Sequence, residues 1–176
     1  MRRAIWLVPV ILLLCVTTKA QQTPAWEFSG GYSHMIANVS GKSFNLDGGE
    51  GSVDENINNW FGGRLEVNAW GGNVAGTRVT AQTFTYGPVF TYRKMDRFTP
   101  FAHFQIGAIH ASQGYLGISE SAFKFAIVPG GGVDVAVSPS LAIRAQGDYL
   151  ASYFLNSRQN NFQFSIGLVF RYGSKK

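Results

Sequence analysis

The sequence predicts an all-β fold, an eight-stranded antiparallel up-and-down barrel, and three observations lead to that prediction. Apolar and polar residues alternate with period 2 over long segments, which is the pattern of strands. Aromatic residues make up 14% of the chain, and glycine contributes 21 of 176 residues. Charged residues also make up only 14%, against about 25% in a typical soluble domain. This composition argues against intrinsic disorder, which lacks aromatics, and against a helical bundle, in which interior glycine is costly.

The first twenty residues are predicted to be a secretory signal peptide. Arg2 and Arg3 precede an apolar run over 4–16, and Ala20 ends a small-residue cleavage site. The apolar run is shorter than the roughly 20 residues that a membrane-spanning helix needs. We therefore divide the chain into a signal peptide over 1–20 and a barrel domain over 21–176.

The leader also accounts for much of the charge and for the only cysteine, Cys15. Three of the 15 basic residues lie in the leader, so the mature chain has 12 basic and 10 acidic residues. No basic helix or stripe follows, and no nucleic-acid partner is expected. Without cysteine, the mature chain can form neither a disulfide nor a thiol-based metal site.

Eight long amphipathic segments follow the leader. The alternation is clearest in the fourth segment, where Phe84, Tyr86 and Phe90 share one face and Thr83 and Thr85 share the other. The sixth and eighth segments repeat it with phenylalanine, isoleucine and valine against glycine, alanine and serine. The predicted strands span, in order, 25–36, 48–57, 60–72, 82–94, 98–112, 122–137, 141–154 and 161–173.

The predicted connections alternate in length. Short turns are expected at 58–59, 96–97 and 138–140, and longer loops at 37–47, 73–81, 113–121 and 155–160. Three prolines, Pro88, Pro100 and Pro129, fall within or near predicted strands, where they are expected to mark bulges. An even number of strands with turns at one end and loops at the other is typical of membrane barrels.

The two faces of the strands indicate which solvent each one meets. Eight strands enclose little volume, so the many phenylalanines and tyrosines of one face would overfill the interior. If that face meets lipid instead, the small and polar residues of the other face fit a narrow lumen. A soluble lipocalin-like barrel that binds a ligand with its aromatic face remains an alternative.

The order of motifs resembles a known family. The match runs through FSGGYSHM (28–35), NLDGGEGSVDENINNWFGGRLEVNAWGG (45–72), YGPVFTYRKMDRFTPFAHFQIGA (86–108), PGGGVDVAVSPSLAIRAQGDYL (129–150) and NNFQFSIGLVFRYG (160–173). The layout is similar to small OmpA/OmpX-type outer-membrane proteins, and more narrowly to the outer membrane protein beta-barrel domain family. This resemblance implies a Gram-negative outer-membrane location, contact with outer-membrane lipid and lipopolysaccharide, and a structural or surface-interaction role. It implies no cofactor and no catalytic residues.

The last predicted strand also resembles the assembly signal of such barrels. The signal has the form polar-x-Gly-x-x-aromatic-x-aromatic, and Ser165, Gly167, Phe170 and Tyr172 occupy its fixed positions. The resemblance implies that the barrel-assembly machinery recognises this strand, most simply by pairing with its edge.

Charged residues on the lumen side form the candidate site. They are expected to pair with one another, because isolated buried charge is costly. Arg144 and Asp148 lie four residues apart on one face, and Arg64 and Glu66 share another. The predicted network comprises Arg64, Glu66, Arg93, Lys124, Asp134, Arg144, Asp148 and Arg171. With the lumen filled by side chains, no open pore is expected.

A lipid-modifying enzyme is the main alternative function. It would need a nucleophile and a base, and the candidate bases are His34, His103 and His110. Ser33 cannot meet His34 because adjacent strand residues face opposite ways, and no acid accompanies His110 and Ser112 on their strand. Five acids, Asp47, Glu50, Asp54, Glu55 and Asp134, lack the spacing of a calcium loop and are interpreted as solvated loop acids. No metal site is predicted, and the sequence identifies no ligand for the loops.

Overall fold

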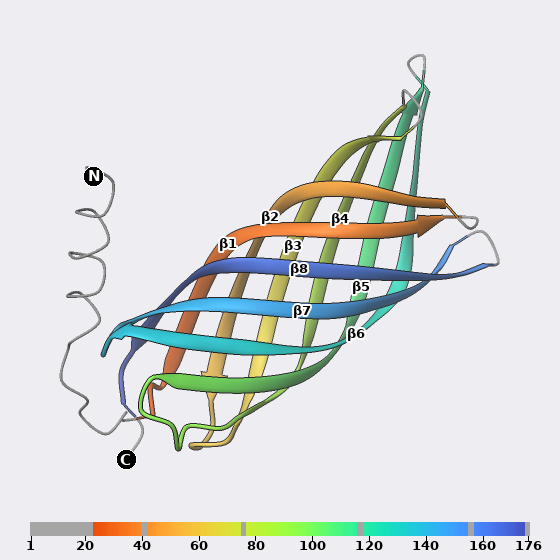
Figure 1. The fold of residues 1–176 in the computed structure, drawn as a ribbon. Coiled ribbons are helices and arrows are strands. Elements are labelled where there is room, and N and C mark those ends of the chain that lie inside the picture. The colour runs from red at the N-terminus through yellow and green to blue at the C-terminus, as the bar shows by residue number, and fades with distance from the viewer. Residues whose placement is uncertain (1–22, 40–41, 75–76, 116–117, 155–156, 175–176) are drawn as a thin grey trace, which may run out of the picture.

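The computed structural model describes residues 23–39, 42–74, 77–115, 118–154 and 157–174, which form one closed antiparallel barrel. The strands are β1 (Trp26–Val39), β2 (Lys42–Asn56), β3 (Phe61–Val74), β4 (Thr77–Thr91), β5 (Phe98–Tyr115), β6 (Ile118–Ser138), β7 (Leu141–Phe154) and β8 (Ser157–Tyr172). Each strand pairs with the next, and β8 pairs with β1, as Figure 1 shows. The predicted fold class and strand number are confirmed. The predicted signal peptide lies outside the described residues, and no helix in the described part is long and apolar enough to cross a membrane.

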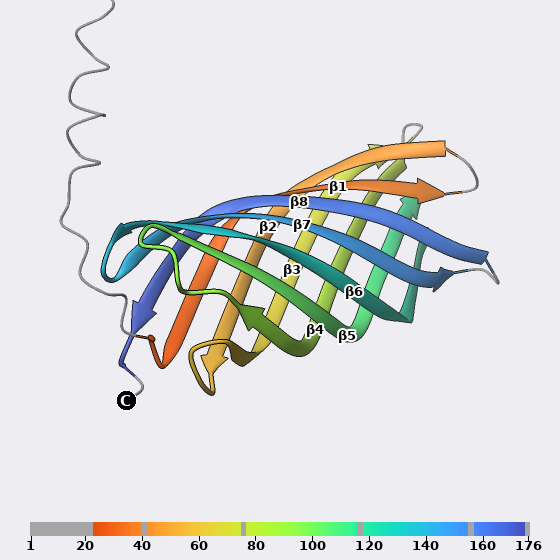
Figure 2. The ribbon, with the colours of Figure 1, turned by 60° about the horizontal axis from the view of Figure 1, so that its bottom comes forward.

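The strands are steeply tilted and staggered around the barrel (Figures 1 and 2). Following the paired residues from Phe28 of β1 once around the barrel leads to Asn160 of β8. The carbonyl of Asn160 accepts a hydrogen bond from the side chain of Asn38, far along β1 from Phe28. This stagger closes eight strands into a barrel whose narrow interior is filled by side chains.

The two faces are distributed as the alternation predicts. Phe84, Phe125 and Phe164 point outward and are more than half exposed, whereas their chain neighbours Ala126 and Ser165 are buried inside. The outward face also carries aromatic residues at the end of the barrel where both termini lie, among them Trp26, Trp60, Phe90, Tyr92, Phe98 and Tyr172. A soluble barrel with an aromatic interior is therefore excluded.

The connections differ from the prediction. The expected long loops are largely strand, because β1 continues to Val39 and β2 begins at Lys42, and the other three hairpins at this end are extended in the same way. The expected short turns instead span 57–60, 92–97 and 139–140. Toward the hairpin ends the alternation is reversed, because Leu46 faces the lumen while Asn45 and Asp47 are exposed. The backbone ladder forms there regardless, because it does not depend on side-chain polarity.

The prolines also behave differently from the prediction. The register of β4 with β5 is the same on both sides of Pro88, and that of β6 with β7 is the same on both sides of Pro129. Only the ladder is interrupted, since paired residues resume at Val89 and at Gly130. Within the described residues the register shifts once, between Ala136 and Ser138 of β6. Pro88 and Pro129 thus lose local hydrogen bonds without forcing a bulge. The pairing of β5 with β6 continues in one register through Pro100, so the bulge predicted there is absent as well.

Candidate functional site: the filled lumen

Inward side chains fill the described lumen in two layers. The half nearest the termini holds a network of charged and amide side chains. The half toward the β1–β2 hairpin holds an apolar cluster of Met35, Ala37, Leu46, Trp70, Ala81, Ile109, Ala126, Val128 and Leu150. The indole N–H of Trp70 donates to the hydroxyl of Ser33 at 2.9 Å, so this cluster leaves its one indole donor satisfied. Both layers lie across the path that an ion would follow.

Asp54 of β2 is the centre of the polar layer. Arg64 of β3 donates to both of its carboxylate oxygens at 2.7 Å, which is the bidentate geometry of a strong ion pair. Arg144 of β7 donates to one of these oxygens at 3.3 Å and to both oxygens of Asp134 on β6, at 2.7 and 2.9 Å. These four side chains are almost completely buried. Two carboxylates and two guanidiniums therefore compensate one another across the lumen.

An aromatic ring lies beside both arginines. The ring centroid of Phe101 on β5 lies 4.5 Å from the guanidinium carbon of Arg64 and 4.7 Å from that of Arg144. Cation–π contacts are stronger where water is excluded. The Phe101 ring thus stabilises two guanidinium cations that would otherwise repel each other.

A second group of charges closes the lumen at the terminal end. Arg93 donates to Glu27 at 2.9 Å, and Arg171 donates to the other oxygen of Glu27 at 3.0 Å. Asn56 donates to the backbone carbonyl of Pro24 at 3.0 Å and accepts from Arg93 at 3.1 Å. Glu27 thereby connects β1 to β8 and to the segment after β4.

The middle of the lumen holds carboxylates without arginine partners. Gln146 donates to Glu66 at 3.1 Å and to Asp148 at 2.8 Å, while its carbonyl oxygen accepts from Arg64 at 2.9 Å. His103 Nδ1 accepts a hydrogen bond from Arg64 at 3.2 Å, so the imidazole proton lies on Nε2. Nε2 is 3.0 Å from Asp148 Oδ1, but the two groups are poorly aligned for a hydrogen bond. One carboxylate oxygen of Glu50 is buried and has no hydrogen-bond partner among the described residues.

A glycine makes room for this arrangement. A Cβ atom on Gly130 of β6 would collide with the carboxylate of Asp148 and with His103 Nε2. Gly130 is therefore required by the packing of the lumen.

The structure places most of the predicted network inside the barrel. Arg64, Glu66, Arg93, Asp134, Arg144, Asp148 and Arg171 all make lumen contacts. No hydrogen bond joins Arg64 to Glu66 or Arg144 to Asp148 in the described lumen. Gln146 bridges Arg64 to Glu66 and also donates to Asp148, while Arg144 bonds to Asp54 and Asp134. Lys124 is exposed toward the hairpin end, where the described residues show no hydrogen bond to it.

Three lumen acids were not predicted as such: Glu27, Glu50 and Asp54. The interpretation of Glu50, Asp54 and Asp134 as solvated loop acids is wrong. On β2 the inward polar residues alternate with outward glycines, so the sequence carries no contrast between the faces. Glu27 had a usable signal, since it lies between the outward Trp26 and Phe28.

The remaining candidates do not form a catalytic triad in the described part of the chain. His34 faces outward, with its Nδ1 2.7 Å from Asp47, which also accepts from Tyr32. Ser33 points into the lumen toward Trp70. The ring of His110 packs on Phe123 with centroids 4.2 Å apart. No described group of three or more His, Cys, Asp or Glu side chains is placed to hold a metal ion.

The four positions of the predicted assembly signal lie at the seam between β8 and β1. Ser165 is buried in the lumen, while Phe170 and Tyr172 are exposed on the outward face. Gly167 pairs with Gly31 of β1, and the two backbones approach so closely that a Cβ on either glycine would collide with the other strand. The glycine of the signal therefore has a steric role in closing the barrel.

The chain matches the family model described as "Outer membrane protein beta-barrel domain" over residues 7–170. No curated protein matches it. Among solved structures, Neisserial surface protein A aligns with a TM-score of 0.75 at 14% identity, covering 84% of this chain and 97% of that one. Ail, the attachment invasion locus protein of Yersinia pestis, aligns with a TM-score of 0.61 at 21% identity, covering 84% and 99%. The N-terminal barrel of Pseudomonas aeruginosa OprF aligns with a TM-score of 0.57 at 11% identity, covering 85% and 100%. The lipid-facing aromatic surface, the closed eight-stranded barrel and the family match together show that this chain belongs to the outer membrane protein beta-barrel domain family and resides in the Gram-negative outer membrane.

Proposed function

We propose that this protein is a closed, non-catalytic barrel that acts through the surface it presents outside the membrane. The observation that carries the proposal is the filling of the lumen by a polar and an apolar layer. A barrel of eight strands has little interior space to begin with. Its functional contacts then belong to the hairpin ends and to the membrane-facing surface.

The names of the similar structures agree with a surface role. One is a surface protein, another is an attachment invasion locus protein, and Ail was also solved with the heparin analogue sucrose octasulfate. At these identities the likeness concerns the fold alone, so the proposal rests on the lumen. We further propose that outer-membrane lipid and lipopolysaccharide surround the outward-facing aromatic side chains. The barrel-assembly machinery is proposed to recognise β8.

Conductance of the purified protein in planar bilayers tests the closed lumen. We expect no steady conductance, because Asp54 and its arginines close one layer and Trp70 and its apolar neighbours close the other. A large steady conductance would overturn the proposal in favour of a channel.

Adhesion of expressing cells to heparin-coated surfaces tests the surface role. Arg78 and Lys124 are exposed cations toward the hairpin ends, and Lys94 is an exposed cation at the opposite end. We expect the double variant Arg78→Ser/Lys124→Ser to reduce adhesion and the control Lys94→Ser to leave it unchanged. Equal adhesion of all three proteins would count against the hairpin ends as the contact surface.

A lipid-modifying enzyme is the second candidate, and one observation favours it. His34 is held by Asp47 on the outward face, which is how an acid orients a catalytic base. The test is mass spectrometry of lipid A from cells that carry the wild type, His34→Ala or an empty vector. Identical acylation in all three supports a non-catalytic barrel, whereas a change that only the wild type produces would establish the enzyme.

A further inference from the structure

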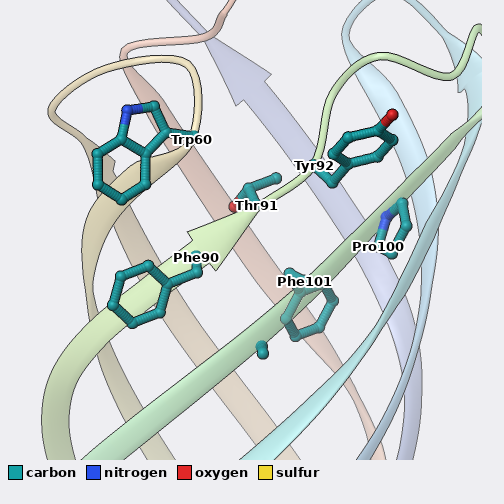
Figure 3. A pocket seen from close by; sticks show the side chains of 7 residues that line it. Trp60, Phe90, Thr91, Tyr92, Pro100 and Phe101 are labelled. Carbon is teal, nitrogen blue, oxygen red and sulfur yellow. The ribbon is translucent and has the colours of Figure 1, made fainter.

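The membrane-facing surface has a hollow at the terminal end of the barrel, between β4 and β5. Its volume is about 390 Å³, and it is lined by Trp60, Phe90, Thr91, Tyr92, Pro100, Phe101 and Ala102. Figure 3 shows Trp60 and Phe90 on one side, Tyr92 and Pro100 on the other, and Phe101 between them. Ala102 is small, whereas Phe90, which pairs with it on β4, and Phe104, two residues further along β5, are large.

The walls of the hollow are held in place before anything binds. The ring of Trp60 stacks on that of Phe90, with centroids 6.1 Å apart and planes 19° apart. The backbone N–H of Trp60 donates to the side chain of Asn58, and its carbonyl accepts from the N–H of Thr91 at 2.8 Å. The floor is fixed as well, since Phe101 is in contact with Arg64 and Arg144 in the lumen. Binding to a preformed surface costs little ordering entropy.

The surroundings of the hollow define its occupant. Its walls are aromatic and aliphatic, and it opens on the side of the barrel that faces acyl chains. Lys94 follows Tyr92 by two residues along the chain and is exposed. That spacing keeps its ammonium within reach of a phosphate at the edge of the apolar walls. An apolar chain attached to a phosphate has the complementary chemistry.

We propose that this hollow is a binding site for one glycerophospholipid, with an acyl chain between Trp60, Phe90 and Tyr92 and the phosphate at Lys94. The proposal depends on the membrane location and on the expected periplasmic position of the terminal end, and it is independent of the surface role. Lipids that contact the rest of the outward surface exchange with the bulk bilayer, whereas this site holds one lipid in a defined position.

Native mass spectrometry of the protein, released from bilayers of phosphatidylglycerol and phosphatidylethanolamine into mild detergent, tests the site. We expect one retained phospholipid per barrel in the wild type. In Ala102→Phe, which fills the hollow, we expect the occupancy to be lower by about tenfold. Lys94→Gln should also lower the occupancy. The matched control is Ala108→Phe, which adds the same ring to the same outward face of β5 away from the hollow. Equal occupancy in Ala102→Phe and Ala108→Phe would overturn the proposal.

Fluorescence gives a second measurement that needs no filling variant. Phospholipids brominated on the acyl chain should quench the wild type more than Trp60→Phe, with saturation near one lipid per barrel. Quenching that is unchanged in Trp60→Phe, or that never saturates, would show annular contact only and refute the site. In bilayers that also contain lipopolysaccharide, selective retention of lipopolysaccharide would refute the assignment to glycerophospholipid.

Discussion

Asp54 and Glu50 are lumen carboxylates with opposite expected responses to neutralisation. Asp54 accepts from two arginines, so Asp54→Asn leaves buried guanidinium charge uncompensated. Breaking a buried pair in this way costs about 3–5 kcal/mol. Glu50 has an unpartnered oxygen and no arginine bonded to it among the described residues, so Glu50→Gln should change stability little. The free energy of unfolding in urea, measured in detergent micelles, distinguishes the two variants. Equal losses would mean that Asp54 does not hold the network together.

The alternation of single residues could be predicted from the sequence, whereas the partners of those residues could not. Arg64, Asp134 and Arg144 face the lumen as their strand positions predict. Two of their contacts join residues paired on neighbouring strands, β3 with β2 and β7 with β6, and one crosses the lumen from β7 to β2. Spacing along one strand carries no information about these contacts. Asp54 was missed for a related reason. It lies between Val53 and Glu55, and the outward positions further along β2 are glycines, so β2 lacks the apolar face that identifies an inward polar residue.

At the scale of elements, the seam between β1 and β8 depends on paired glycines. A Cβ on Gly167 would lie 2.6 Å from the carbonyl oxygen of Gly30, closer than real Cβ contacts. We expect Gly167→Val to destabilise the barrel by about 1–3 kcal/mol, as overpacking does, and to reduce the folded band on unheated gels. The control is Gly51→Val, because a Cβ there points outward and meets its nearest described atom at 3.7 Å.

If Gly167→Val and Gly51→Val unfold at the same urea concentration, the close approach at the seam does not limit stability. A folded Gly167→Val barrel that nevertheless accumulates poorly in the outer membrane would instead point to recognition of β8 during assembly. The two measurements therefore separate the steric role of Gly167 from its predicted role as a signal.

The strand core was predictable from sequence because lipid imposes a strict contrast between the faces. The predicted strand ends are wrong where the outward face is no longer apolar. Ser43 and Asn45 belong to β2 although they had been assigned to a loop, since here the polar residues are exposed and the apolar Leu46 faces the lumen. Pro88 was expected to cause a bulge, but a fully paired strand on its β3 side holds the register. Hydrogen bonds to a neighbouring strand are not visible in a single sequence.

At the scale of the whole molecule, the apolar layer of the lumen went unpredicted. Its larger members, Met35, Leu46, Trp70 and Leu150, come from four different strands. Leu46 lies between Asn45 and Asp47, and Trp70 lies between Ala69 and Gly71. On these segments the usual assignment of apolar residues to the outward face is reversed. The layer lies toward the hairpin ends, and the charged network lies toward the termini, so the barrel is polarised along its axis.

Because the two ends of the barrel differ, its orientation in the membrane can be tested. An even number of strands puts both termini on one side, and we expect that side to be periplasmic, with the hairpin ends outside. Asn73 and Asn59 are both exposed, one near the hairpin end of β3 and the other in the turn before it. In a Cys15→Ser background an introduced cysteine is the sole thiol. Asn73→Cys should react with an impermeant maleimide on whole cells, and Asn59→Cys only after lysis. Labelling of Asn59→Cys alone on whole cells would reverse the barrel, and it would also move the hollow beside Trp60 into the leaflet that holds lipopolysaccharide.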